Sequence, residues 1–307
     1  MGDQDFCFVV AADAHQGYHK NAKVAKAEFA RTIRQINAFD PAFVVMCGDM
    51  ISSAPVHKTD EQVLAMWDEF DEQVKMLKAP LKLVPGNHDI NTFAGETQSS
   101  TLDIYAERYG QTYYSFDHEQ CHFIVLNAEV IKDGDKTVSL GGALSDEELA
   151  WLEADLEKNH DAKHTFVFVH RPSWQTTQTS AKVLKHWQEK VEPLLARYKV
   201  AAVFAGHLHR YCNYGQRDGV QYYGLANCGG GKVGGTIPKG TNLSDHDLEE
   251  IGGFRHFMLV EVRDNGWTCK VAKRDGLHPD TIVTVEQITN RIMAIKKSQE
   301  KPTASPK

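Results

Sequence analysis

Three side chains that can bind metal ions follow a short apolar segment in the first third of the chain. Residues 81–84 are largely apolar and end at a Pro-Gly pair. This pair stops a strand because proline has no N–H donor and glycine permits tight turns. The next residues are Asn87, His88 and Asp89. Each of these residue types also occurs in ordinary turns, so this segment alone is weak evidence for a site.

The same arrangement recurs at four other places along the chain. In each case a continuous apolar run, typical of a buried strand, ends in aspartate, histidine or both. The residues at these ends are Asp13 and His15, Asp49, His170, and His207 and His209. A single such residue is more often a cap or a structural histidine. Ligands of open α/β sheets bind beyond the carboxyl ends of the strands, so we expect the five turns to converge.

The residue types at these turns favour a metal site. Carboxylate, imidazole and amide oxygen together suit a divalent ion of the transition series. The ligands are numerous enough for two ions, and two ions ~3.5–4 Å apart need a bridging group, for which a carboxylate is best. Asp49 is the expected bridge, because the glycine before it lets the backbone come close.

The elements that must position these residues alternate along the chain. Apolar runs predict strands over 6–11, 43–47, 81–84, 165–169 and 200–205. Helical spacing predicts helices over 22–38, 59–76, 101–109, 145–159 and 181–198. This alternation predicts an α/β fold with a mainly parallel sheet.

Other segments carry weaker patterns. We expect a hairpin of 113–116 with 122–126, and short antiparallel strands at 220–224, 255–262 and 267–273 that close a second sheet. Residues 132–142 and the glycine-rich residues 226–253 are expected to be loops. Ser145 and Glu148 predict a capping box at the start of their helix. No linker divides the chain, so we expect one domain over residues 1–295 and a disordered polar tail over 296–307.

Composition disfavours several classes of protein. The formal net charge is -7 and no basic block offsets it, which disfavours a nucleic-acid partner. No apolar run is as long as a membrane span, so no membrane partner is expected. Six cysteines without CxxC spacing favour reduced thiols and a cytoplasmic location, unless a leader was removed. The oligomeric state is not predicted.

The five turns together resemble the calcineurin-like metallophosphoesterase family, with the CPPED-like single-domain members most similar in layout. The matching blocks are Asp13-Ala14-His15, Gly48-Asp49, Gly86-Asn87-His88-Asp89, His170 and Gly206-His207-Leu208-His209. The resemblance extends from about Phe6 to Val271. It implies a four-layer α/β/β/α sandwich of two mixed sheets flanked by helices.

The resemblance also implies a dinuclear centre of divalent or mixed-valence iron, manganese or zinc. One ion is expected on Asp13, His15, Asp49 and His209, and the other on Asp49, Asn87, His170 and His207. The implied reaction is hydrolysis of phosphate monoesters, on phosphoproteins or small molecules, by a metal-activated hydroxide. His88 is the candidate general acid and Asp89 the candidate that orients it. Asn87 and Arg171 are candidates for binding the phosphate, although a structural salt bridge explains Arg171 equally well.

Alternatives remain open at several points. The same metal site could serve a phosphodiesterase acting on cyclic nucleotides or other diesters. A catalytically silent metal-binding scaffold would be expected to lack ligands, and none is missing. Residues 228–232 are either an anion cradle or a flexible lid, with the lid favoured, and Trp174 lines the pocket or belongs to the core. Ser52, Ser53 and His57 lie close enough in sequence to reach the site.

Overall fold

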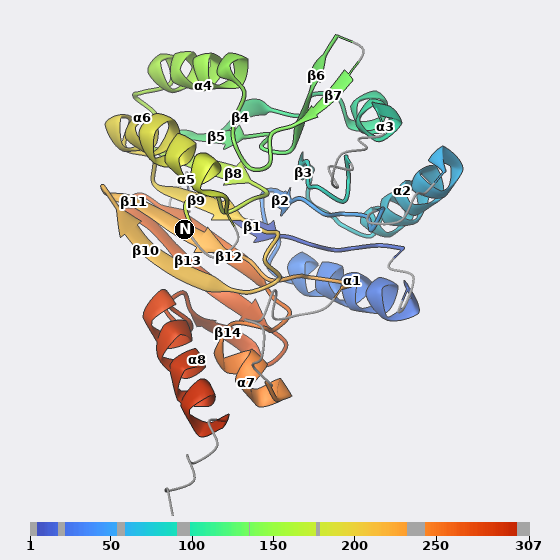
Figure 1. The fold of residues 1–307 in the computed structure, drawn as a ribbon, viewed down its shortest axis with the longest axis vertical. Coiled ribbons are helices and arrows are strands. Elements are labelled where there is room, and N and C mark those ends of the chain that lie inside the picture. Colours follow the sequence, from blue (N-terminus) through green and yellow to red (C-terminus); the bar gives the residue numbers. More distant parts are fainter. Residues whose placement is uncertain are drawn as a thin grey trace, which may run out of the picture.

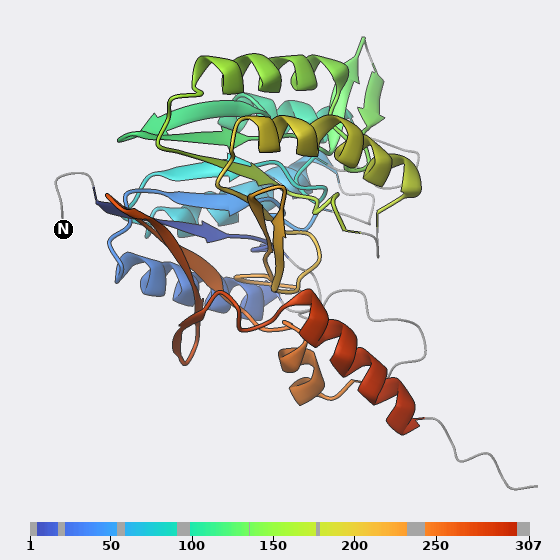
Figure 2. The ribbon, with the colours of Figure 1, turned by 90° about the vertical axis from the view of Figure 1, so that its left-hand side faces the viewer.

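Two six-stranded mixed sheets pack face to face, and helices cover their outer faces (Figures 1 and 2). The computed structural model describes residues 5–17, 22–53, 59–90, 99–134, 136–175, 179–231 and 243–299. Figure 2 shows the four layers nearly edge-on. The predicted α/β/β/α sandwich is confirmed.

The first sheet has the order β14-β13-β12-β1-β2-β3. Its strands are β1 (Phe6–Ala11), β2 (Val44–Cys47), β3 (Leu81–Val84), β12 (Phe257–Arg263), β13 (Gly266–Lys273) and β14 (Gly276–Pro279). The first three are parallel to one another, and β12 pairs antiparallel with β1. The turns after β1, β2 and β3 therefore lie at one edge of this sheet.

The second sheet has the order β10-β11-β9-β8-β5-β4. Its strands are β4 (Tyr114–His118), β5 (Cys121–Val125), β8 (His164–Val169), β9 (Ala202–Ala205), β10 (Cys212–Arg217) and β11 (Val220–Gly224). The inner four strands are parallel, and β4 and β10 are antiparallel at the two ends. The turns after β8 and β9 thus share an edge, as predicted.

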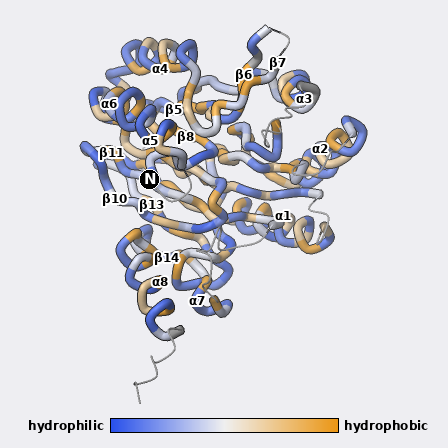
Figure 3. The backbone as a smooth tube through the Cα atoms, viewed as in Figure 1, coloured by the Kyte–Doolittle hydropathy of each residue, from blue (hydrophilic) through white to orange (hydrophobic). Residues whose placement is uncertain are grey.

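Helices line each outer face. The helices beside the first sheet are α1 (Ala22–Asn37), α2 (Asp60–Val74) and α3 (Ser99–Tyr109). Those beside the second are α4 (Asp146–Lys158), α5 (Ala181–His186), the π-helical turn η1 (Trp187–Val191) and α6 (Glu192–Arg197). Figure 3 shows hydrophilic and hydrophobic bands along the peripheral helices, as expected where only one side is buried. The helices α7 (Asp245–Glu250) and α8 (Val285–Gln299) project from one end of the molecule (Figure 1).

Aromatic side chains fill the space between the sheets. The rings of Phe8 and Phe43 are stacked with centroids 5.2 Å apart, and Phe8 meets the ring of Phe166 edge-on, also at 5.2 Å. All three belong to the buried cluster between the sheets. This packing fixes the two sheets against each other, so the turns at their shared edge are held by a rigid core.

The strand predictions were wrong in three places. Residues 132–142, expected as a loop, contain most of the hairpin β6 (Val130–Asp133) and β7 (Lys136–Ser139). A two-stranded hairpin away from the main sheets lacks the alternation that marks a half-buried strand. The strands β12 and β13 belong to the first sheet rather than the second, and β11 pairs parallel with β9. Pairing partners distant in sequence leave no local signal.

Three helix predictions also need correction. Ser145 caps α4 by accepting the backbone N–H of Glu148, but the Glu148 carboxylate accepts the backbone N–H of Asn127 instead of completing the capping box. The helix α7 lies inside the expected loop 226–253. The expected tail is helical as far as Gln299, and lysines in the last turn stabilise the helix by interacting with the negative end of its dipole. Residues 300–307 lie outside the described residues. None of the described helices combines the length and apolar character needed to cross a lipid bilayer.

Candidate metal centre

The five predicted turns meet at one place between the two sheets. Two groups of side chains each bring their ligand atoms within 4.8 Å of one another. The first group is Asp13, His15, Asp49 and His209, and the second is Asp49, His170 and His207. Asp49 belongs to both groups, which is the position that a bridging carboxylate would occupy.

The first group has the donor set and convergence that a divalent ion requires. The Nε2 atoms of His15 and His209 lie 2.8 Å apart. The Nε2 atom of His209 lies 3.3 Å from Oδ1 of Asp13, and that of His15 lies 3.6 Å from Oδ2 of Asp49. Two imidazole nitrogens facing each other beside two buried carboxylates fit a shared cation, so these four residues could hold one ion.

The amide of Asn87 lies beside the second group. The Nε2 atom of His170 lies 3.3 Å from Oδ2 of Asp49 and 3.1 Å from Oδ1 of Asn87. The other ring nitrogen of His170, Nδ1, lies 2.8 Å from the carbonyl oxygen of Cys47. A hydrogen bond from Nδ1–H to this carbonyl leaves Nε2 free for an ion, which is how ligating histidines are usually oriented.

The backbone at these turns is strained. A non-glycine residue with positive φ is uncommon, and the left-handed conformation costs about 1–2 kcal/mol per residue. Five of the predicted ligands adopt it: Asp13 (56°), His15 (46°), Asp49 (55°), His207 (71°) and His209 (51°). The packed strands before these turns hold the side chains in this arrangement, which is typical of functional sites.

Glycines beside the ligands let the turns approach one another. A Cβ atom on Gly48 would collide with the ring of His170, and one on Gly86 would collide with the backbone and carboxylate of Asp49. A Cβ atom on Gly206 would lie 2.6 Å from Oδ2 of Asp13. The Gly-Asp, Gly-Asn and Gly-His pairs of the sequence are therefore needed for close packing of the turns.

The charges of the site balance one another. Burial alone would raise the pKa of Asp13, but the neighbouring imidazoles, above all His209, outweigh it and lower this pKa. Burial would also raise the pKa of Asp49, but the neighbouring His170 outweighs burial and holds this pKa well below its usual range. Burial opposes protonation of His170, but Asp49 outweighs it and raises the pKa of His170 to about 10. These carboxylates attract positive charge, which protons or metal ions can supply.

His88 lies at the open side of the site. Its Nε2 atom is 4.0 Å from Oδ2 of Asp49, and its ring meets that of His15 edge-on at 4.7 Å between centroids. The His88 side chain is 18% exposed, whereas Asp49 is fully enclosed. An imidazole so placed can reach both the site and a ligand that enters from solvent.

Asp89 is directed at the Asp49 turn. Its Oδ2 atom accepts the backbone N–H groups of Asp49 and Gly86, each at 2.8 Å, and its Oδ1 atom accepts that of Ile51 at 3.1 Å. The Asp49 carboxylate in turn accepts the backbone N–H of His88 at 2.7 Å. These bonds connect the turns after β2 and β3, and they do not involve the ring of His88.

Glu129 is a site residue that the sequence reasoning missed. Both of its carboxylate oxygens lie 2.9 Å from Nε of Arg171, and Nη1 of Arg171 lies 3.1 Å from Nε2 of His207. The Glu129 side chain is buried, whereas that of Arg171 is 23% exposed. The signal was present, because Glu129 follows β5 as the other site residues follow their strands. Arg171 thus forms a salt bridge and lies beside a predicted ligand.

The glycine-rich segment after β11 is fixed at its start. Asn227 donates to the carbonyl oxygen of Gly230, and the backbone N–H groups of Cys228 and Gly230 donate to the carbonyl oxygens of Ala12 and Ala14. A Cβ atom on Gly231 would lie 3.2 Å from Cδ2 of His15 and 3.3 Å from Cε1 of His209. The prediction of a flexible lid is therefore wrong for residues 228–231, because backbone hydrogen bonds hold them against the site. Lys232 lies outside the described residues.

The remaining candidates from the sequence lie in the core or near the centre, or outside the described residues. Trp174 is fully buried and contacts Trp187 at 5.7 Å between ring centroids, so the core interpretation is confirmed. Ser52 and Ser53 are buried near the site, and the Ser53 hydroxyl donates to the carbonyl oxygen of His88. His57 lies outside the described residues.

Comparisons with known proteins agree with this geometry. Human serine/threonine-protein phosphatase CPPED1 is 28% identical over 256 residues, covering 77% of this chain and 74% of that protein. Purple acid phosphatase 23 of Arabidopsis thaliana is 28% identical over 257 residues, covering 71% of this chain. The chain spans only 50% of the length of purple acid phosphatase 23 and 37% of that of purple acid phosphatase 15.

Solved structures share the fold. A dimetal phosphatase from Danio rerio superposes with a TM-score of 0.62 at 16% identity and covers 89% of this chain and 97% of its own. The family model for calcineurin-like phosphoesterases matches residues 7–211, which include all the ligand turns. The chain therefore belongs to the calcineurin-like phosphoesterase family.

Proposed function

We propose that this protein is a dinuclear-metal phosphomonoesterase. The observation that carries the proposal is the position of Asp49, whose carboxylate is shared by both groups of ligand side chains. We assign Asn87 to the second group on the basis of its 3.1 Å contact with His170. Iron, manganese and zinc all suit these ligands. When bound, two such ions would neutralise phosphoryl oxygens and lower the pKa of a water nucleophile.

The residues around the two groups would complete the reaction. We assign His88, on the open side, to protonating the leaving oxygen as general acid. Arg171 and Asn87 would bind the phosphoryl oxygens, with Glu129 holding the guanidinium beside His207. We assign Asp89 to holding the Asp49 turn, because its hydrogen bonds go to backbone N–H groups there.

The relatives support a more specific substrate class. CPPED1 is named a serine/threonine-protein phosphatase, and we infer a phosphoserine or phosphothreonine substrate for this protein as well. All six cysteines are free thiols, which supports a reducing compartment such as the cytoplasm. We further propose that residues 1–295 form the catalytic domain.

Paired activity assays test the proposal. The metal-reconstituted protein is assayed on p-nitrophenyl phosphate and bis-p-nitrophenyl phosphate, beside Asp49→Asn and the surface control Asp264→Asn. We expect a preference for the monoester that Asp49→Asn abolishes and Asp264→Asn retains. A preference for the diester would instead identify a phosphodiesterase, and two bound ions without turnover of either compound would indicate a silent scaffold.

A further inference from the structure

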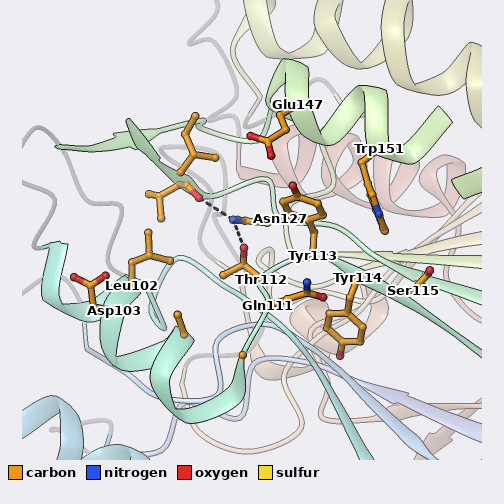
Figure 4. A pocket seen from close by; sticks show the side chains of 14 residues that line it. Leu102, Asp103, Gln111, Thr112, Tyr113, Tyr114, Ser115, Asn127, Glu147 and Trp151 are labelled. Carbon is orange, nitrogen blue, oxygen red and sulfur yellow. Dashed lines mark hydrogen bonds between the residues drawn. The ribbon is translucent and has the colours of Figure 1, made fainter. Parts of the chain in front are cut away.

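A cavity opens at the same edge of the second sheet as the metal centre. Its volume is about 650 Å³. It lies between α3, α4, the start of β4 and the β6–β7 hairpin, and Figure 4 shows its lining side chains. Thr112 and Tyr113 enter from the chain before β4, whereas Glu147 and Trp151 enter from α4.

The sheet register places this cavity next to the catalytic edge. Val125 of β5 pairs with Phe168 of β8, and two residues further along each strand lie Asn127, which lines the cavity, and His170, which lies in the metal centre. The Oδ1 atom of Asn127 also accepts the backbone N–H of Glu129, the partner of Arg171. Asn127 thus connects the lining of the cavity to the Glu129–Arg171 pair beside the centre.

The spacing between the two sites is that of a short peptide. Neighbouring strands lie about 4.8 Å apart, so β4 is about 10 Å from β8. An extended peptide rises about 3.3 Å per residue, so about three residues cover this distance. A chain whose phosphorylated residue is at the metal centre could therefore place another side chain in the cavity.

The lining of the cavity favours a cation. The described residues that line it include the carboxylates Asp103 and Glu147 and no lysine, arginine or histidine. Tyr113 and Trp151 are half-buried, with ring centroids 5.0 Å apart, and the Glu147 carboxylate lies near the Tyr113 hydroxyl. Aromatic faces beside a carboxylate bind guanidinium and ammonium groups well.

We propose that this cavity binds an arginine or lysine side chain of the phosphoprotein substrate, about three residues from the phosphorylated residue. The proposal rests on the phosphomonoesterase function inferred above. It specifies the substrate class as serine or threonine phosphopeptides with a nearby basic residue. Glu147 is the main specificity residue, and the Tyr113–Trp151 pair forms the wall on which the cation lies.

Phosphopeptide kinetics test the proposal. An alanine-rich phosphoserine peptide is compared with versions that carry one arginine two, three or four residues to either side. We expect arginine at one of these positions to lower KM about five- to tenfold, with little change in kcat. Glu147→Gln should remove this advantage, and Glu147→Lys should transfer it to a peptide with glutamate there.

The matched control is Glu153→Gln, which alters an exposed carboxylate of the same helix that pairs with Arg197. It should retain the arginine preference and hydrolyse p-nitrophenyl phosphate as the unaltered protein does. The cavity proposal is overturned if no arginine position lowers KM, or if the preference survives both changes at Glu147.

Peptide binding separates this proposal from the proposed activity. Fluorescence anisotropy of labelled phosphopeptides measures the same preference without turnover. Failure to hydrolyse p-nitrophenyl phosphate would refute the phosphomonoesterase function, whereas equal affinity for peptides with and without arginine would refute the cavity proposal.

Discussion

The backbone N–H of Asp49 donates a 2.8 Å hydrogen bond to the carboxylate of Asp89. The residue shared by both ligand groups is thus held by an acidic residue from the turn after the next strand. The same carboxylate accepts two further backbone N–H groups, so both of its oxygens are in use. This arrangement links the backbone of the two turns to each other.

Replacement of Asp89 by asparagine should therefore damage the centre without touching a ligand. In the variant, the amide NH₂ would face a backbone N–H group that the Asp89 carboxylate accepts in the unaltered protein, so at least one hydrogen bond would be lost. Hydrogen bonds to charged groups contribute about 1.5–3 kcal/mol each. We expect a lower free energy of unfolding in urea and fewer than two bound metal ions per chain. Equal metal content in Asp89→Asn and the surface control Asp275→Asn would contradict this role.

A side chain at Gly231 should disturb the metal centre because of the position of this residue, and not because of its backbone conformation alone. Its φ of 79° is almost the same as the 76° of Gly215, where an added Cβ atom would meet nothing within 4 Å. Alanine should therefore cost about 1–2 kcal/mol of backbone strain at either position. Only Gly231→Ala should also weaken metal binding, because it would push against His15 and His209. Isothermal titration of both variants with Mn²⁺ or Zn²⁺ measures the difference, and equal affinities would refute the explanation.

Glu129→Gln should impair phosphate binding through Arg171. The variant keeps the shape of the side chain but leaves the guanidinium without its counter-charge, so Arg171 should no longer be held beside His207. We expect KM for a phosphate monoester to rise on the order of tenfold, with a smaller fall in kcat. The matched control is Glu192→Gln, which breaks the remote pair with Arg217 and should leave KM unchanged. An unchanged KM in Glu129→Gln would disprove the positioning role.

Glu148 should make stability depend on pH. Burial raises the pKa of its carboxyl group to about 8, well above the 4.5 of an unperturbed glutamate. The protonated form is therefore favoured by folding, so the contribution of this group to stability is fully present below pH 4.5 and is lost as the pH rises to about 8. Glu148→Gln stays neutral and keeps an acceptor for the backbone N–H of Asn127.

The variant should accordingly be more stable than the unaltered protein at pH 8, by on the order of 3–5 kcal/mol, and the difference should shrink toward pH 5. Urea unfolding at several pH values measures it. A stability difference that is independent of pH would show that the Glu148 carboxyl group is not perturbed in the folded protein.

The sequence predicted what is local and missed what is not. Each ligand turn could be found because its ligand immediately follows a recognisable buried strand, as Asp13 follows Phe6–Ala11. The pairing of β12 with β1 joins residues about 250 positions apart, and no local pattern reports it. The Asp89 carboxylate looked suited to His88 because the two are adjacent in sequence, but neighbouring side chains in a turn point in different directions.

The site was predictable in its ligands and less so in its supporting residues. Glu129 follows a strand, as the ligands do, yet a lone glutamate gives no hint that it will meet an arginine from another strand. The effect expected at Gly231 depends on the contact of residues 228–231 with His15 and His209, which belong to two other turns. Such contacts arise only from tertiary packing, which residue type and spacing do not specify.

The central claim is that Asp49 joins two metal ions, and metal content tests it most directly. The protein is reconstituted with excess Mn²⁺ or Zn²⁺, freed of unbound metal and measured by inductively coupled plasma mass spectrometry. We expect two ions per chain for the unaltered protein and at most one for Asp49→Asn, with Asp264→Asn retaining two. One ion or none in the unaltered protein, or two ions in Asp49→Asn, would contradict it.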